Sequence, residues 1–368
     1  MWNGSLVVDA VGHTYDFSVD NRRPNVPIEG YDGFIQWLYG YGHAPLESTK
    51  AGYLLSLEEF RGGWTTEELL TMFFVESDVD LVAMHAVNFF DLFIRGANPW
   101  EQCIAVKEAA PHRTLLYPAV DPLSNRGAEL DKMTERAEAG QVDGFKFYPV
   151  NGLFDYHGAA LSYSFADEKI FPFFEHARNL GVKHIAVHKA LPTAPGPHHQ
   201  DRPDDVSAAA AAFPDMTFEV VHSGWAFLED CAFQLQMNPN IYANLETTAN
   251  TAGRMPRRFL KSVGLLLATA PKQVLFGTGA PLGHPQPIIE AIADMQMPED
   301  LLEEGLPELT DELKADLFGG NFARMLGLDV AQLTKTIAED EFTRRRAEWL
   351  QGDKEPWALK RARIAAGG

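Results

Sequence analysis

The chain has 368 residues, of which 46% are hydrophobic and 22% are charged, a composition that suits a large buried core and excludes an intrinsically disordered protein. Its formal net charge is −20, and no basic stripe with interleaved aromatic residues offsets it, so we expect no nucleic acid among its partners. We also expect no membrane contact, because no apolar run is long enough to span a bilayer. Residues 1–5 lack the features of a secretion signal, and only two cysteines occur, as is usual in a reducing compartment. We therefore predict a cytoplasmic protein.

Eight short apolar runs, each of a length that suits a buried parallel strand, follow one another along the chain. These predicted strands cover residues 6–9, 81–85, 114–119, 144–148, 184–188, 217–222, 241–246 and 273–278. Helical patterns lie between most of them, at residues 65–76, 100–109, 127–139, 168–180 and 206–213. Strands that alternate with helices form parallel sheets through right-handed crossovers. Eight such units predict an α/β fold in which the sheet closes into a (β/α)₈ TIM barrel.

Three connections after predicted strands are long and rich in aromatic residues or proline, at residues 15–63, 149–165 and 189–203. Long loops on an ordered scaffold often form lids or binding walls, although packing of the aromatic rings onto the barrel explains them equally well. After the eighth strand, residues 286–295 and 310–328 are predicted to form helices that complete the barrel. We therefore predict a barrel domain over residues 1–328 and a charged helical extension over residues 329–368.

Reactive side chains lie at or just beyond the carboxyl ends of the predicted strands. They are His13, His85, Lys146, His188, His222 and Glu246. In a closed barrel these strand ends meet on one face, and that face holds the active site. The alternative, a doubly wound open sheet, normally has a GxGxxG turn after its first strand, and this sequence has none. The pattern therefore favours the barrel and predicts a catalytic site on that face.

Six short segments near the strand ends form a set that is specific in its order and spacing. They read VDAVGH at 8–13, GFKFYP at 144–149, VHK at 187–189, VHSG at 221–224, FGTGAP at 276–281 and GNFARMLG at 320–327. In this order they resemble the amidohydrolase-2 branch of the metal-dependent amidohydrolase superfamily, over about residues 5–328. The resemblance implies a barrel with one or two divalent metal ions (zinc, iron or manganese) at the strand ends. Such an ion lowers the pKa of bound water to about 7, and neutral imidazole is its commonest ligand.

Two positions depart from the pattern of that family. Its first strand usually ends in an HxH pair, whereas this chain has Val11 and His13. Its eighth strand is usually followed by an aspartate, whereas this chain has Gly279. With two expected ligands missing, the usual mononuclear site cannot form unchanged.

Three arrangements of the site are compatible with these residues. The first has four metal ligands: His13, His188, His222 and Glu246. In it, Glu246 replaces the lost carboxylate, unless it pairs with Lys189 or Arg254 instead. In the second, a carboxylated Lys146 bridges two metal ions together with His188 and His222. In the third there is no metal, and the histidines act as acids and bases around an anionic substrate.

The resemblance implies a metal-dependent hydrolase, in which metal-bound hydroxide attacks the carbonyl of an amide, ester, lactone or thioester. The aromatic loops indicate an apolar or ring-containing small molecule as the substrate. We expect His222 or Lys189 to stabilise the oxyanion, and Glu246 or His284 to move protons. The alternative is a metal-dependent, non-oxidative decarboxylase of an aromatic or unsaturated carboxylic acid. A third hypothesis, a barrel that binds a ligand without turnover, follows from the two missing ligands, and a homo-oligomer is compatible with the charged C-terminal segment.

Overall fold

The computed structural model describes residues 1–43, 50–151, 161–192, 199–353 and 355–367. The strands are β1 Val8–Gly12, β2 Leu81–His85, β3 Thr114–Tyr117, β4 Ala119–Val120, β5 Phe145–Phe147, β6 Val150–Asn151, β7 Leu161–Ser162, β8 His184–His188, β9 Thr217–Val221, β10 Ile241–Asn244 and β11 Val274–Leu275. In the described part of the chain, one parallel sheet has the order β1-β2-β3 and a second has the order β11-β10-β9-β8-β5-β4. Strands β6 and β7 form a separate antiparallel pair.

The two parallel sheets join into one closed barrel. The third strand of the barrel contributes to both sheets, because β3 pairs with β2, β4 pairs with β5, and only Pro118 separates β3 from β4. At the other junction, the backbone N–H of Ala10 donates to the carbonyl of Phe276 at 3.0 Å. The N–H of Gly279 donates to the carbonyl of Val11 at 2.9 Å. These bonds link β1 to the segment that continues β11, which confirms the predicted TIM barrel.

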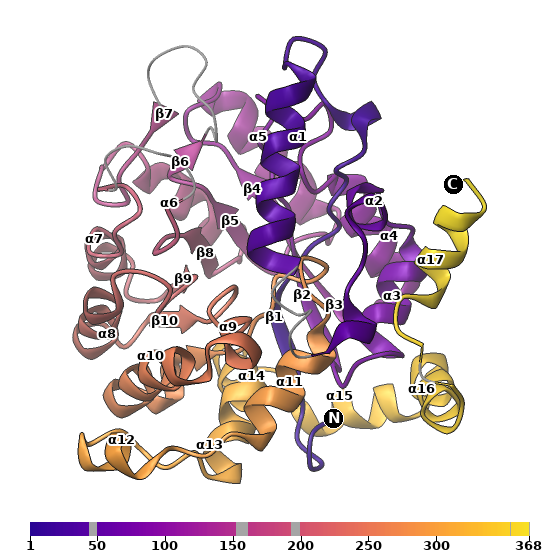
Figure 1. Ribbon diagram of the computed structural model, residues 1–368. Coiled ribbons are helices and arrows are strands. Elements are labelled where there is room, and N and C mark those ends of the chain that lie inside the picture. Colours follow the sequence, from indigo (N-terminus) through magenta and orange to yellow (C-terminus); the bar gives the residue numbers. More distant parts are fainter. Residues whose placement is uncertain (44–49, 152–160, 193–198, 354, 368) are drawn as a thin grey trace.

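Helices surround the barrel (Figure 1). They are α1 Ile28–Leu38, α2 Leu57–Arg61, α3 Thr66–Phe74, α4 Trp100–Ala109, α5 Arg126–Glu138, α6 Phe171–Asn179, α7 Val206–Ala212, α8 Leu228–Met237, α9 Thr251–Arg254, α10 Pro256–Thr269, α11 Pro285–Asp294, α12 Glu299–Glu303, α13 Asp311–Ala315, α14 Asn321–Leu326, α15 Val330–Ala338, α16 Glu341–Gln351 and α17 Ala358–Ala365. Short 3₁₀ turns lie at Val19–Asn21, Ala51–Tyr53 and Pro271–Gln273, and π-helical turns at Tyr39–His43 and Asp316–Gly320. None of the described helices is long and apolar enough to cross a membrane.

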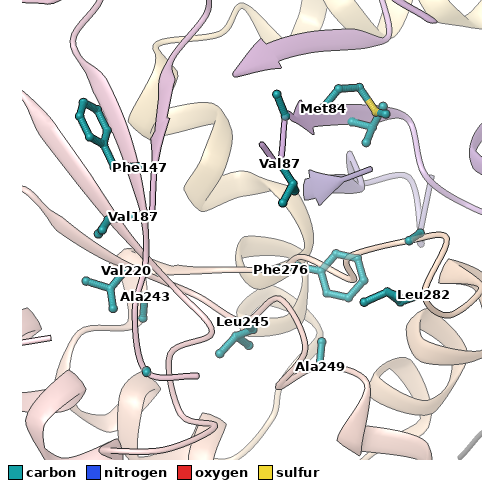
Figure 2. Packing of buried hydrophobic residues seen from close by; sticks show 14 of the residues in the cluster. Met84, Val87, Phe147, Val187, Val220, Ala243, Leu245, Ala249, Phe276 and Leu282 are labelled. Carbon is teal, nitrogen blue, oxygen red and sulfur yellow. The ribbon is translucent and has the colours of Figure 1, made fainter. Parts of the chain in front are cut away.

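The side chains of the strands divide between two hydrophobic cores. One row of register partners crosses four neighbouring strands: Phe147, Val187, Val220 and Ala243. This row belongs to the larger core, between strands and helices, and Figure 2 shows its close packing. Successive residues of a strand face opposite sides, so the preceding row, which includes Lys146, Ala186 and Glu219, faces the barrel interior. The strand pattern thus places ionisable groups inside the barrel.

The strands predicted at 81–85 and 184–188 have the bounds seen in the structure, whereas the other six differ, most notably the first and the third. The first begins at Val8, not at residue 6, and continues to Gly12. The third is divided at Pro118, because proline has no N–H to donate to a neighbouring strand. These differences leave the order of the eight strand regions unchanged.

The helix predicted at residues 310–328 is broken into α13, a π-helical turn and α14. The turn contains Gly319, where a Cβ would lie only 2.2 Å from the carbonyl oxygen of Leu6. The backbone therefore approaches the start of β1 more closely than any other residue type would allow.

The connection at residues 15–63 was predicted as a loop, but it contains helices α1 and α2. Parts of the other two long connections, residues 152–160 and 193–198, lie outside the described residues, as do residues 44–49. Two aromatic residues of the connection at 149–165, Phe154 and Tyr156, therefore lie outside the described residues. The predicted lids are therefore described only in part.

The segment after residue 328 forms helices α15 to α17. Helix α16 packs against α3, and α17 packs against α2, on the outside of the barrel (Figure 1). Between them, Trp357 is buried and its indole N–H donates to the carbonyl of Tyr53 at 2.8 Å. The helical extension is thus packed onto the barrel, while the domain boundary at residue 328 stays a prediction.

Candidate functional site

A cavity lies at the carboxyl ends of the strands, where the sequence predicted the catalytic face. Five of the predicted site residues line it: His13, Lys146, His188, His222 and Glu246. Each of these is at most 8% exposed. The other lining residues are mainly apolar or aromatic, and include Tyr15, Phe17, Phe34, Trp37, Val87, Phe89, Tyr148, Leu191 and Leu282. A few polar groups among apolar walls are typical of a site for a small molecule.

Left-handed backbone at the strand ends turns two of these side chains into the cavity. Val221 and His222 both line it, although neighbouring residues of a regular strand face opposite sides. The regular strand stops because His222, just after β9, has a φ of 68°. At the end of β10, Thr247 has a φ of 64°, next to Glu246. Such conformations are unfavourable for residues with a side chain, and where they persist they often mark functional sites.

His188 and His222 form a close pair at the ends of β8 and β9. The Nε2 atom of His188 lies 3.0 Å from the carbonyl oxygen of Leu191, to which it must donate a proton. Its Nδ1 atom is therefore unprotonated, and it lies 2.8 Å from Nε2 of His222. Burial lowers the pKa of His188 well below its ordinary value, and the nearby charges of His222 and Lys146 lower it further. His188 is therefore a neutral acceptor at its cavity-facing nitrogen.

The carboxylate of Glu246 contacts the other side of the His222 ring, at Nδ1. Burial by itself would raise the pKa of Glu246, but the charge and hydrogen bond of His222 outweigh burial and, with His13 and Lys146, lower the pKa to about 2. Because an ionised carboxylate can only accept, Nδ1 of His222 carries a proton. A neutral His222 would then direct an Nε2 lone pair at the Nδ1 lone pair of His188. A positive charge, either a proton or a metal ion, must therefore lie between the two rings.

His13, one residue after β1, is held on its outer side. Its Nδ1 atom lies 3.0 Å from the carbonyl oxygen of His85 and 2.5 Å from Nδ2 of Asn98. Burial lowers the pKa of His13 to about 4, so the ring is neutral at physiological pH. When Nδ1 donates its proton to the His85 carbonyl, Nε2 carries the lone pair that a ligand in the cavity would meet.

Lys146 is buried in β5, with its ammonium 5.2 Å from the centre of the Tyr148 ring. The described residues offer this ammonium no hydrogen bond. Burial lowers the pKa of Lys146 to about 7, against the opposing charges of Glu246 and Glu219. The side chain is therefore able to lose or gain a proton near neutral pH.

Two predicted catalytic residues do not line the cavity. The ammonium of Lys189 donates to Asp205 at 2.9 Å and to the carbonyl of Gln200 at 2.6 Å. Nε2 of His284 lies 3.1 Å from the carboxylate of Glu76, and its Nδ1 caps the start of α11. Both side chains are fully buried in these contacts. The structure therefore places both side chains away from the cavity, and their roles at the oxyanion and in proton transfer stay predictions.

Three polar residues near the site had little or no signal in the sequence. Tyr15 and Tyr148 line the cavity, but nothing distinguished them from the aromatic residues that pack the loops. His85 stacks on Tyr117, with ring centres 4.5 Å apart, and neither of its ring nitrogens has a hydrogen-bond partner among the described residues. Its place at the end of the second predicted strand identified it as a reactive side chain on the catalytic face, but gave it no role.

A family profile described as Amidohydrolase matches residues 71–328, well over half of the chain. The chain therefore belongs to the amidohydrolase family. This confirms the resemblance that the strand-end motifs indicated. No curated protein matches the chain significantly.

Several solved structures have a fold similar to that of this chain. An uncharacterised TIM-barrel protein from Bordetella bronchiseptica superposes with a TM-score of 0.58 at 17% identity, covering 89% of this amidohydrolase and 99% of that chain. An amidohydrolase from Burkholderia multivorans with bound zinc gives 0.52 at 12% identity, covering 88% and 100%. A 5-carboxyvanillate decarboxylase from Novosphingobium aromaticivorans, complexed with manganese and a nitrobenzoic acid, gives 0.51 at 11% identity, covering 88% and 97%. At these sequence identities, the likeness shows a shared fold and nothing more specific.

The residues of the cavity have the chemistry of a metal site. Metal-binding histidines usually engage their outer nitrogen with a carboxylate or a carbonyl, as the outer nitrogens of His13, His188 and His222 do here. Within the described residues, no three His, Cys, Asp or Glu side chains are already gathered around one point. The 2.8 Å between the inner nitrogens of His188 and His222 is also shorter than the roughly 3.3 Å between two ligands of tetrahedral zinc. The donor set fits an ion, provided that the rings part slightly.

Proposed function

We propose that this amidohydrolase is a metal-dependent hydrolase that attacks the carbonyl of an amide, ester, lactone or thioester in a small, apolar or ring-containing molecule. One observation carries the proposal. The facing nitrogens of His188 and His222 require a positive charge between them, while their outer nitrogens are engaged as those of metal ligands usually are. A divalent ion of zinc, iron or manganese meets this requirement, and when bound it supplies a strong nucleophile by lowering the pKa of water to about 7.

The residues of the cavity would bind the ion and the substrate and would assist the reaction. His13, His188 and His222 would hold the ion through their cavity-facing nitrogens. Lys146, buried and without a hydrogen-bond partner among the described residues, would stabilise the negative charge that develops on the substrate oxygen. Its pKa of about 7 also allows it to deliver a proton to a leaving group near neutral pH. The aromatic walls would bind the ring of the substrate and exclude bulk water.

Elemental analysis of the purified protein tests the metal site. We expect about one ion per chain in the wild type, and its loss in the double variant His188→Ala/His222→Ala. The matched control is His176→Ala/His184→Ala, which removes two partly buried histidines that do not line the cavity and should keep the ion. Metal that remains bound in the His188/His222 variant would contradict the proposal. Two ions per chain would instead support the carboxylated Lys146 bridge.

A panel of esters, lactones, amides and thioesters of ring-containing acids tests the reaction. The metal-loaded wild type should hydrolyse at least one class, and the His188→Ala/His222→Ala variant none. Absence of hydrolysis across the whole panel, with the metal fully loaded, would count against a hydrolase.

Decarboxylation is the second candidate function, and Lys146 is the observation that favours it. A buried ammonium without a hydrogen-bond partner among the described residues, next to aromatic rings, suits the carboxylate of an aromatic acid, and its proton could be transferred to the ring carbon that loses carbon dioxide. Release of carbon dioxide from a series of hydroxybenzoates, without hydrolysis of the ester and amide panel, would select this function. No release from any of them would remove it.

A further inference from the structure

Gly279 lies beside Glu246, where the segment after β11 pairs with β1. Its φ is 68°, and a Cβ built at this position would lie 2.0 Å from Oε1 of Glu246 and 3.0 Å from its carboxyl carbon. Side chains do not pack at such distances. The carboxylate of Glu246 therefore fills the volume that any side chain at position 279 would need.

Each part of Glu246 is held by a separate contact. Its Oε1 accepts a hydrogen bond from the hydroxyl of Thr247 at 2.9 Å, and its backbone N–H donates to Oδ1 of Asn244 at 3.1 Å. Its other oxygen contacts Nδ1 of His222. Because the residue is 2% exposed, water cannot replace these partners. The carboxylate thus has one well-defined place, between the His222 ring and the backbone of Gly279.

We propose that Glu246 is a positioning residue for His222, and that Gly279 is required because it leaves room for this carboxylate. The contact fixes the proton of His222 on Nδ1 and directs Nε2 towards His188. What the site needs is therefore a carboxylate at this point in space, and either strand end could deliver it. This inference rests on the proposed function only in taking Nε2 of His222 as the nitrogen that acts in the cavity.

A double-mutant cycle between the two positions tests the steric part of the proposal. Glu246→Ala should lower zinc affinity about 10- to 100-fold, the usual effect of removing an outer partner of a metal-binding histidine. Gly279→Ala should cause a similar loss, because the new Cβ displaces the carboxylate. In the Glu246→Ala background, Gly279→Ala should cause little further loss. Additive losses in the double variant would show that the two positions do not share this space.

The control for backbone strain is Gly327→Ala. Gly327 has a similar φ of 65°, and a Cβ there would have no atom within 4 Å. It therefore measures the effect of a left-handed alanine without a steric conflict, and zinc affinity should stay at the wild-type value. A loss as large as that of Gly279→Ala would assign the effect to strain and overturn the steric argument.

The decisive variant is Glu246→Ala/Gly279→Asp, which moves the carboxylate from one strand end to the other. Aspartate is among the residues that tolerate a positive φ best, and the space left by Glu246 is available to it. Zinc affinity should recover most of the loss seen in Glu246→Ala. No recovery, in a variant whose unfolding transition matches the wild type, would overturn the proposal.

Nitrogen NMR of the metal-free protein provides a readout that does not depend on metal or turnover. The Nδ1 signal of His222 should be that of a protonated nitrogen in the wild type and in Glu246→Ala/Gly279→Asp. In Glu246→Ala the ring should shift towards the other tautomer. An unchanged His222 spectrum in Glu246→Ala would contradict the positioning role. A shifted spectrum in a protein that never binds zinc would keep this inference and reject the metal site.

Discussion

The histidines predicted for the site differ in whether a ring nitrogen remains available to a substrate or ligand. One nitrogen is available in His13, His188 and His222, and none is available in His284. In the first three, one nitrogen is engaged with a carbonyl or a carboxylate and the other is left to the cavity. In His284, Glu76 engages Nε2 and the N–H of Gln286 donates to Nδ1. A histidine with no available nitrogen cannot accept a proton from a substrate.

The substitution His284→Asn tests whether His284 takes part in catalysis or only in structural contacts. Asparagine also caps helix N-termini well, so the start of α11 should survive, while the contact with Glu76 is lost. We expect kcat/KM to stay within about threefold of the wild type, whereas His222→Asn should lower it about 100-fold or more. Steady-state kinetics on a substrate from the panel measures both. A large loss in His284→Asn, with the fold intact, would support its predicted role in proton transfer.

Lys146 makes the stability of the protein depend on pH. Its pKa falls from 10.5 in an exposed lysine to about 7 in the barrel, mainly through burial. Between these two values the unfolded chain binds more protons than the folded one, so the free energy of unfolding rises with pH across this window. Below about pH 7 both states are protonated, and the destabilising effect of the buried ammonium is complete.

Lys146→Met should remove this rise. The variant should be more stable than the wild type at about pH 6, and the difference should decrease towards pH 10, as measured by urea unfolding. Lys183→Met, at a side chain that is 52% exposed, is the control and should show no such trend. A difference between Lys146→Met and wild type that is constant with pH would contradict the lowered pKa.

At the scale of elements, the C-terminal helix α17 is joined to the first long connection of the barrel. The indole of Trp357 packs against His284 and Trp64, with ring centres 4.7 and 5.2 Å apart. The ammonium of Lys360 lies over the Trp64 ring and donates to the carbonyls of Gly62 and Gly63. The extension therefore stabilises the segment that follows α2.

Trp357→Ala should lower the free energy of unfolding by about 3–5 kcal/mol, because it removes a large side chain that is 2% exposed. Leu359→Ala, in the same region but at a residue that is 43% exposed, should change it by about 0.5 kcal/mol or less. Urea unfolding of the two variants measures the difference. Equal effects would mean that the extension is not packed onto the barrel in solution.

At the scale of the whole molecule, the net charge of −20 opposes the compact state through self-repulsion. Part of this charge is concentrated in one segment, since residues 299–312, around α12 and α13, contain seven acidic and no basic residues. Salt screens such repulsion over distances of about 10 Å at 0.1 M. The stability of the protein should therefore depend on ionic strength.

The variant Glu303→Gln/Glu308→Gln/Glu312→Gln tests this by neutralising three exposed side chains of the segment. At low salt its melting temperature should exceed that of the wild type by a few degrees. The gap should close as sodium chloride increases to about 0.5 M. A gap that does not change with salt would point to local packing of the new side chains and not to repulsion.

Much of the fold followed from local patterns in the sequence. Buried parallel strands have nearly continuous apolar sequences. The order of these apolar runs and of the helical patterns between them was enough to predict the barrel. The same patterns placed His188 and His222 at neighbouring strand ends, where the structure brings them together. The bounds of β1, the division of the third strand at Pro118 and the broken helix before residue 328 were not predicted, because they depend on contacts with other segments.

The sequence by itself determined the barrel, the family and the face on which the histidines gather, because strand periodicity and order along the chain are local properties. Only the tertiary structure decided which polar side chains line the cavity. Lys189 forms an ion pair with Asp205, and His284 contacts the carboxylate of Glu76. These partners cannot be predicted from the local sequence, because other segments bring them into contact. In the same way, Glu246 meets His222 because Gly279, from a third strand end, has no side chain to exclude it.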